Sequence, residues 1–384
     1  MPTPPLTDDE LRKTLDTLAE NGGKTGPTAE ALGISRSALY NRLARASLRG
    51  LAGDTPRPVP HGQVIKGVST LYDRNGQVAA TWVKTRAEAL PLADVVDAIR
   101  EALAEHRSAP APVPDPVPEG ADDLLALFLL PDFHLGMNAW GAETGEDYDL
   151  AIAESLARGA FADLVRRAPA AQEAVILGLG DFTHADDESA TTRRSGNHLD
   201  VDTRHGKVLK VAIRLLVWKI DLALTRFPHV RVRVLKGNHD EQTAAAITAA
   251  LALFYEANPR VTVDESPSLW WFHRHGRVLL GATHGHTCKP DDMPGVMASD
   301  CPEDWGRSVW RYMHHGHWHH KRATERMGVM VEGHRSPAAK DAYHAGGPYR
   351  SARSLAVITY HRDRGEMGRD TVNIPSGRTK AEAV

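Results

Sequence analysis

The chain has 384 residues, of which 46 are basic and 49 acidic, so its net charge is −3 and its isoelectric point lies near 6.7. Hydrophobic residues make up 42% of it, enough for two or three domains with buried cores, which excludes disorder as a description of the whole. The near-neutral balance excludes a protein that coats nucleic acid or membrane by bulk charge, so any nucleic-acid contact must come from a local patch. The two cysteines, Cys288 and Cys301, cannot form a disulfide framework.

No basic segment followed by an apolar one opens the sequence, and no stretch approaches the roughly 20 apolar residues of a membrane-spanning helix. The sequence therefore predicts a cytoplasmic protein without a membrane partner. Its composition gives no indication of protein partners.

Residues 1–60 predict a small helical module. Within TAEALGISRSALYNRLARA (residues 28–46), a short helix ends at Gly33, Ser35 can cap the next helix, and Leu39 and Leu43 share that helix's buried face. This arrangement resembles a helix-turn-helix, with residues 35–46 as the recognition helix.

The predicted recognition helix is locally basic. Residues 24–57 contain six basic and two acidic side chains, which gives 6 − 2 = +4. We expect this surface to bind nucleic acid, with DNA favoured; the alternatives are a solvated basic face or a protein contact. The residues expected to contact nucleic acid are Arg36, Ser37, Tyr40, Asn41 and Arg45.

An accessory region and a linker are expected next. Residues 61–106 combine a hairpin around Asn75-Gly76 with a helix over 92–106. Proline then occupies every second position from Pro110 to Pro118, so residues 107–120 predict an extended linker.

Residues 121–384 predict an α/β domain. Four apolar runs have the length of strands, and helical stretches at 149–168 and 206–226 separate the first three. Each run is followed by polar residues, which are expected at the carboxyl ends of strands, where ligands bind in open α/β sheets. The runs are LLALFLL, AVILGLG, VRVRVL and RVLLGAT.

The residues after the predicted strands form a pattern in chain order: Asp132-Phe-His134, Gly180-Asp181, Gly237-Asn238-His239-Asp240, His284, and Gly316-His317-Trp-His319. This pattern resembles the D-x-H, G-D, G-N-H-D, H, G-H-x-H blocks of the calcineurin-like metallophosphoesterases, and it spans residues 124–335. The resemblance implies a four-layer α/β/β/α sandwich, which would follow the predicted helix-turn-helix and hairpin domain. It also implies a hydrolase of phosphoric esters.

The resemblance further implies a site for two divalent metal ions. Hydrolysis of a phosphate ester needs a hydroxide nucleophile near neutral pH and positive charge on the phosphoryl oxygens, and two metals supply both. A mixed oxygen and imidazole ligand set favours Mn²⁺, with Fe or Zn²⁺ as alternatives. By resemblance, Asp132, His134 and His319 hold one metal, Asn238, His284 and His317 hold the other, Asp181 bridges them, His239 is the catalytic acid and Asp240 orients His239.

The substrate class is indicated less directly. Protein phosphatases of this superfamily have G-D-x-V-D-R-G and G-N-H-E, and the chain departs from both, whereas its D-x-H-L-G stretch resembles the SbcD-like nucleases. A long polar segment follows Asp181, in which Arg193 and Arg194 are expected to bind phosphate oxygens and His184 to approach the leaving group; its alternative is a solvated charged loop. The whole arrangement resembles proteins encoded by phages and prophages.

The sequence thus predicts a dinuclear metal-dependent phosphodiesterase or nuclease that acts on nucleic acid. One alternative is a phosphatase or phosphodiesterase of small molecules or nucleotides. Another is a DNA-binding regulator with a degenerate phosphoesterase domain.

Overall fold

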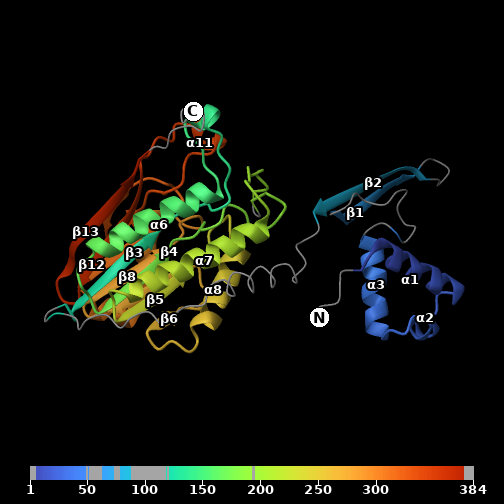
Figure 1. Cartoon of the computed structure of the whole chain (residues 1–384), viewed down its shortest axis with the longest axis horizontal. Helices are drawn as coiled ribbons and strands as arrows, with labels where there is room; N and C mark the ends of the chain where they lie inside the picture. The colour runs from blue at the N-terminus through green and yellow to red at the C-terminus, as the bar shows by residue number, and fades with distance from the viewer. Residues whose placement is uncertain are drawn as a thin grey trace. The chain divides into compact units, whose positions relative to one another are not determined.

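A computed structural model of the chain describes residues 6–48, 51, 63–72, 78–87, 118, 121–192 and 195–375. The chain divides into two compact units, residues 1–93 and 94–384 (Figure 1). The helix expected at 92–106 lies outside the described residues, as does the expected linker at 107–120 apart from Pro118.

Three helices form the start of the first unit, and local capping explains their ends. At the first helix the Thr7 hydroxyl accepts a hydrogen bond from the Glu10 N–H, and the Glu10 carboxylate accepts one from the Thr7 N–H. Gly33 follows the second helix with a φ of 64°, and the Ser35 hydroxyl accepts a hydrogen bond from the Ala38 N–H. The predicted helical pair and its cap are confirmed. The helices are α1 (Asp8–Glu20), α2 (Thr25–Ala31) and α3 (Arg36–Leu48).

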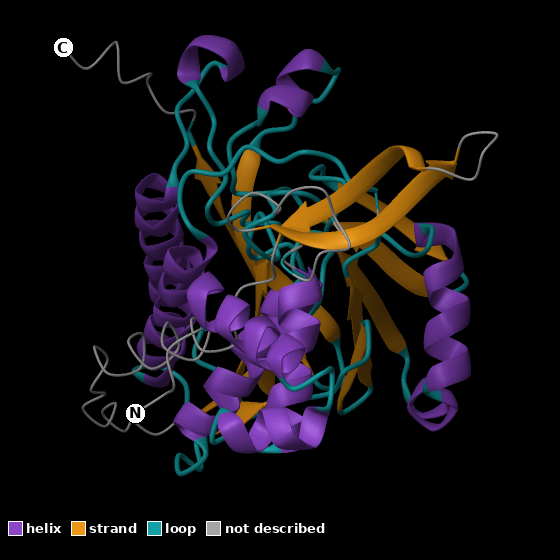
Figure 2. Ribbon diagram, turned by 90° about the vertical axis from the view of Figure 1, so that its right-hand side faces the viewer, coloured by secondary structure: helices purple, strands orange, loops and turns teal. Residues whose placement is uncertain are grey.

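The predicted hairpin is also observed. Strands β1 (Gln63–Tyr72) and β2 (Val78–Ala87) form an antiparallel hairpin (Figure 2). In its register Tyr72 lies opposite Val78. The Asn75-Gly76 turn lies outside the described residues.

A six-stranded sheet forms the centre of the second unit, in the order β13-β12-β3-β4-β5-β6. Strands β3 to β6 are parallel, β12 is antiparallel to β3, and β13 is antiparallel to β12. Three of the four predicted strands lie here and are confirmed. The strands are β3 (Leu124–Leu130), β4 (Glu173–Gly178), β5 (His229–Val234), β6 (Val261–Val263), β12 (Arg353–His361) and β13 (Gly365–Ile374).

A second sheet has the order β10-β11-β9-β8-β7 and includes the fourth predicted strand, β8. β8 and β9 are parallel, β9 and β11 are parallel, and the outer pairs are antiparallel. The strands are β7 (Trp270–His275), β8 (Val278–Thr283), β9 (Trp310–His315), β10 (Arg322–Arg326) and β11 (Val329–Gly333).

Alternation of side chains along the strands links the two sheets and the helices. Successive residues of a strand point to opposite faces. In β3, Leu127 belongs to the core shared with β8 of the second sheet, whereas Phe128 belongs to the core under the helices. In β8, Leu280 belongs to the shared core and Leu279 packs with methionines of α9 (Met293–Asp300). Continuous apolar runs therefore suit these strands because both of their faces are buried.

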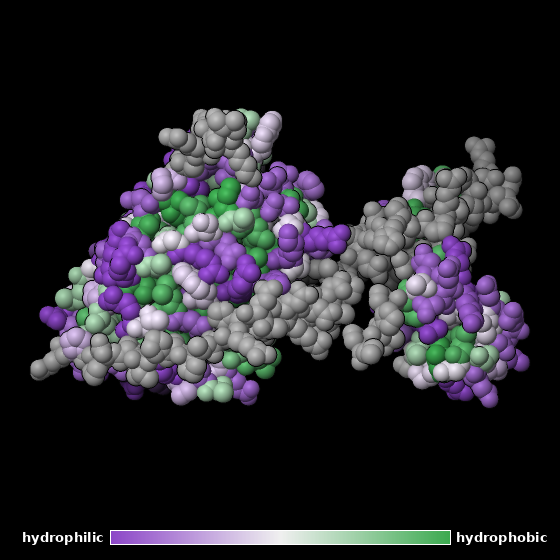
Figure 3. All heavy atoms as spheres, in the orientation of Figure 1, coloured by the Kyte–Doolittle hydropathy of each residue, from purple (hydrophilic) through white to green (hydrophobic). Residues whose placement is uncertain are grey.

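Helices α6, α7 and α8 cover the outer face of the six-stranded sheet (Figure 1). The Asp149 carboxylate caps α6 by accepting a hydrogen bond from the Ile152 N–H. On the face seen in Figure 3, apolar residues lie among hydrophilic ones. Among the described helices, none is long and apolar enough to cross a membrane. The helices predicted at 149–168 and 206–226 and the α/β class are confirmed. The helices of this unit are α5 (Gly141–Thr144), α6 (Leu150–Arg167), α7 (His205–Leu224), α8 (Glu241–Tyr255), η1 (Pro290–Asp292), α9 (Met293–Asp300), α10 (Pro302–Arg307) and α11 (Ala342–Gly346).

Candidate metal centre

The residues of the sequence pattern follow the carboxyl ends of five strands. Asp132 follows β3, Asp181 follows β4, Asn238 follows β5, His284 follows β8 and His317 follows β9. Because β3, β4 and β5 are parallel, as are β8 and β9, the ends of each set lie at one edge of its sheet. The loops that leave these edges bring residues far apart in the sequence together.

Backbone strain is concentrated in these loops. Among the described residues, seven residues other than glycine have a positive φ, and five of them belong to the predicted ligand set. Such conformations cost about 1 to 3 kcal/mol each and persist only where the surrounding structure enforces them. The five are Asp132 (φ 43°), His134 (46°), Asp181 (50°), His317 (68°) and His319 (53°).

The first group of ligand atoms consists of Asp132, His134 and His319, which lie within 4.8 Å of one another. The Nε2 atoms of His134 and His319 are 3.2 Å apart, and His319 Nε2 is 3.3 Å from Asp132 Oδ1. Asp132 is fully buried, and both its carboxylate oxygens accept a hydrogen bond from the His317 N–H. This is the trio expected to hold the first metal.

The second group consists of Asp181, His284 and His317. His284 Nδ1 donates to the Leu179 carbonyl at 2.8 Å, so Nε2 is the nitrogen that faces the site. This Nε2 lies 3.1 Å from Asp181 Oδ2 and 3.1 Å from Asn238 Oδ1. The structure therefore brings together all three residues expected to hold the second metal, with Asp181 beside them.

Two glycines of the pattern allow these close approaches. A Cβ at Gly237 would overlap the Asp181 carboxylate, and one at Gly316 would lie 2.5 Å from Asp132 Oδ2. Because the neighbours are the buried carboxylates themselves, neither position has room for a side chain.

Burial and mutual charge set the protonation of the groups. Burial lowers the pKa of His134 well below its usual value, and burial together with His284 lowers the pKa of His317 to about 4. For His284, burial is outweighed by Asp181, which raises the pKa to about 9. His134 and His317 are therefore neutral at neutral pH, the form that binds metals, whereas a cation must displace a proton from His284. Metal affinity is consequently expected to rise with pH until the pH reaches the pKa of His284, about 9.

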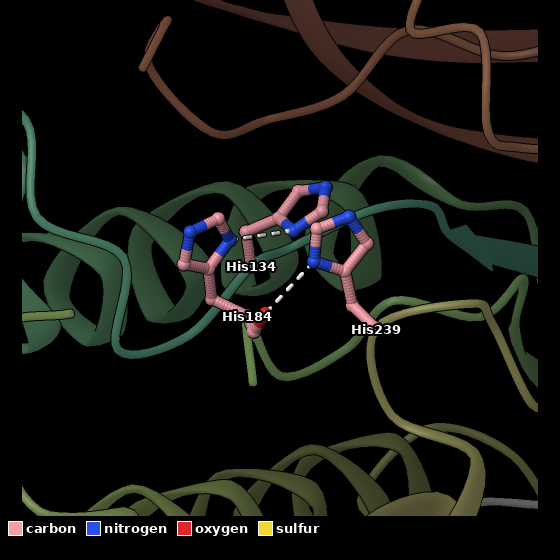
Figure 4. A group of neighbouring side chains, drawn as sticks. All are labelled: His134, His184 and His239. Atoms are coloured by element: carbon pink, nitrogen blue, oxygen red, sulfur yellow. Dashed lines mark hydrogen bonds between the residues drawn. The ribbon is translucent and has the colours of Figure 1, made fainter. Parts of the chain in front are cut away.

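His239 packs against the first group without entering it. Its ring centroid is 4.8 Å from that of His134, and its Nδ1 donates to the His184 carbonyl at 2.8 Å (Figure 4). Nε2 of His239 is the ring nitrogen that takes no part in this hydrogen bond. His239 lines a cavity of about 630 Å³, and His134, Asp181 and Asn238 line the same cavity.

For His184 the structure differs from the prediction. Its side chain is only 2% exposed, and its Nδ1 lies 3.2 Å from His134 Nδ1 (Figure 4). Burial and His239 lower its pKa to about 3. His184 therefore positions His134 and His239 and does not line the cavity, because the loop after Asp181 folds it inwards.

For Asp240 the structure also differs. Its carboxylate accepts hydrogen bonds from the N–H groups of Gly237, Asp181, Phe182 and Thr183, at 2.6 to 3.2 Å. Burial and the charge of Asp181 raise its pKa to about 7. Asp240 thus fixes the backbone of two ligand loops, and the carbonyl of His184 takes the predicted orienting role on the His239 ring.

Other predicted residues lie elsewhere. Arg193 and Arg194 lie outside the described residues. On α3, Leu39 is buried and Leu43 partly buried, while Arg36, Asn41 and Arg45 are exposed together with Tyr40, which is 57% exposed; the side chain of Ser37 lies outside the description.

Residues 336–344 support the first group and were not predicted from the sequence. The Ser336 hydroxyl donates to the Asp132 carbonyl at 2.7 Å. The His344 ring stacks on His319 at 5.0 Å, and Asp341 holds His344 Nδ1 at 2.6 Å. No apolar run ends beside these residues, so the strand-end pattern could not identify them.

Another group of metal-ligand type lies outside this site. His314, Glu332 and His334 are buried together, with His314 Nδ1 3.0 Å from His334 Nε2. The Arg369 guanidinium donates to both carboxylate oxygens of Glu332, at 2.6 and 3.1 Å. The carboxylate charge is therefore already matched by a cation.

Comparisons with known proteins give limited similarity. No protein-family model and no curated protein matches the sequence. Among solved structures, a single mutant of Vps29 from Entamoeba histolytica is 12% identical, with a TM-score of 0.30 over 65% of this chain and 99% of that chain. Wild-type Vps29 from the same organism, complexed with zinc, is 12% identical, with a TM-score of 0.28 over 65% and 98%.

A conserved uncharacterized protein from Streptococcus pneumoniae, described as a predicted phosphoesterase, is 11% identical, with a TM-score of 0.27 over 65% of this chain and 98% of that chain.

Proposed function

We propose that the chain is a metal-dependent phosphoesterase of the calcineurin-like type, with its four-layer sandwich in residues 121–384. The observation that carries the proposal is the pair of adjacent ligand groups beside one open cavity. Asp132, His134 and His319 would hold one divalent ion, Asn238, His284 and His317 the other, and Asp181 would lie between them. The ions, with Mn²⁺ favoured over Fe or Zn²⁺, would supply positive charge to the phosphate and activate water.

The donor set fits such ions. Two buried carboxylates face four imidazoles and one amide oxygen, and a buried carboxylate requires a nearby cation or hydrogen-bond donors. In both Asp132 and Asp181, a backbone N–H satisfies only part of the acceptor capacity.

The chain's own residues account for the proton that the reaction needs. Hydrolysis of a phosphodiester forms a bond from a water oxygen to phosphorus and breaks the bond to an ester oxygen, which leaves with a proton. His239 Nε2 would donate that proton, because Nδ1 is already engaged with the His184 carbonyl. The proton lost by the water passes to solvent.

The proposed substrate is nucleic acid. The site would act as a phosphodiesterase or nuclease, and the basic face of α3 in a helix-turn-helix would hold the polymer. Turnover of the purified chain with Mn²⁺, Fe²⁺ or Zn²⁺ on a monoester, a small diester, and single- and double-stranded DNA and RNA tests this. We expect diesters to be hydrolysed faster than monoesters; exclusive monoester turnover would support a small-molecule phosphatase, and no turnover with any metal would support a degenerate domain.

The role of α3 has a separate test. We expect Arg36→Ala with Arg45→Ala to weaken binding of long nucleic acid, because fewer phosphates are neutralised. The slope of log affinity against log salt concentration should become shallower by about two. Turnover of a small diester should not change. The matched control is Arg12→Ala on α1, which lies outside the predicted recognition helix; equal losses in both proteins would remove the case for α3.

A further inference from the structure

Aromatic side chains extend from the metal centre to the surface. The His344 ring stacks on the ligand His319, and the Tyr349 ring lies 5.1 Å from His344. Tyr343 lies 5.9 Å from Tyr349, and the two tyrosines are 73% and 44% exposed. Together with Trp318, these three residues line the cavity of the metal centre, and we call the four side chains the aromatic wall.

Three members of the aromatic wall, Tyr343, His344 and Tyr349, lie on one loop whose backbone accepts or donates several hydrogen bonds. Asp341 caps α11 by accepting a hydrogen bond from the His344 N–H at 2.8 Å, and it also binds the His344 ring. The Arg350 guanidinium donates to the carbonyls of residues 344, 345, 347 and 349. The tyrosines are therefore exposed although their backbone is fixed, which is the arrangement expected of a preorganised binding surface.

A second cavity, of about 670 Å³, adjoins the first and shares Trp318, His344 and Tyr349 with it. Lys340, Arg350 and Arg353 bring positive charge to this cavity, and Glu146 pairs with Arg353 at 3.0 Å. Within the described part of the chain, Lys340 has no ion-pair or hydrogen-bond partner. Three members of the aromatic wall thus line both the cavity of the metal centre and a second cavity that carries the unmatched charge of Lys340.

We propose that the substrate is a single-stranded nucleic acid, one base of which stacks on Tyr343 and Tyr349 while the neighbouring phosphate approaches Lys340. This rests on the proposed phosphodiesterase function and specifies its substrate. Rings beside a cationic groove are how proteins bind single strands without reading sequence, because every base has a face that can stack. A paired base has its faces covered by its neighbours in the duplex, so the exposed tyrosines favour an unpaired nucleotide.

The test measures coupling between the tyrosines and the bases. Binding of the full chain to a fluorescent single-stranded phosphorothioate oligonucleotide, and to an oligomer of equal length without bases, is followed by anisotropy with Mn²⁺ present. We expect Tyr343→Leu with Tyr349→Leu to weaken binding of the complete oligonucleotide about 10- to 100-fold and to leave binding of the baseless oligomer unchanged. Lys340→Gln should weaken both.

Controls keep the outcomes separate. Leu253→Ala, at a side chain that is 71% exposed on α8, should change neither affinity, and thermal unfolding verifies that each variant folds. Equal losses with both oligomers, or equal affinity of the unmodified chain for single strand and blunt duplex, overturn the proposal. If a small diester is hydrolysed but no coupling is found, only this inference fails. Absence of turnover on every ester contradicts the proposed function, while the coupling is still measured by binding.

Discussion

Asp181→Asn is expected to abolish turnover and to reduce metal content below two ions per chain. Asp181 is 1% exposed, and its Oδ2 lies 3.1 Å from His284 Nε2 while its Oδ1 accepts the His239 N–H. Burial raises the pKa of Asp181, but His284 and His239 outweigh it and hold the pKa well below its usual value, so the group is a carboxylate at neutral pH. An amide lacks that charge and offers one metal-facing oxygen in place of two.

Metal analysis of the purified variant, with turnover on the same sample, checks this result. The matched control is Asp186→Asn, because Asp186 is also a buried carboxylate that accepts backbone hydrogen bonds, from Gln242 and Thr243, but belongs to neither ligand group. The control should keep both ions and most of the activity. Two bound ions and full activity in Asp181→Asn would exclude it as a ligand between the metals.

The strands could be predicted because their signal is local. LLALFLL and the other apolar runs are buried on both faces, so they appear as uninterrupted hydrophobic segments, and the polar residues after them fall at the carboxyl ends of the sheets. The grouping of Asp132 with His319 and of Asp181 with His284 was implied by the resemblance and not by strand order, because the strands before the two members of each pair lie in different sheets.

The contacts that depend on the path of a loop could not be predicted in this way. Asp240 was expected at the His239 ring, but its neighbours in space are backbone N–H groups of two loops, which no residue pattern specifies. His184 faces inwards, where its Nδ1 lies 3.2 Å from His134 Nδ1. The aromatic wall lies in residues 318–349, and its tyrosines carry no motif that links them to the metal ligands.

His239→Ala is expected to retain both metals and to lose rate by about 10²- to 10⁴-fold, the usual contribution of a general acid. The loss should be smaller on esters of 4-nitrophenol, because a good leaving group needs less protonation. Metal should remain because the His239 side chain bonds to the His184 carbonyl and contributes no atom to the two ligand groups built on Asp132 and Asp181.

His284→Ala provides the contrast in the same assays. Its Nε2 faces Asp181 and Asn238, so its loss should weaken metal binding, and activity should recover in part at high Mn²⁺. The assays must also exclude that His239 is itself a metal ligand, because its ring nitrogen lies within ligand distance of those of His134 and His184. If His239→Ala loses metal and recovers at high Mn²⁺ as His284→Ala does, then His239 is a ligand and the proton must come from another group. If His239→Ala keeps its metal and high Mn²⁺ restores nothing, the defect lies in proton transfer, since the ligand groups are intact.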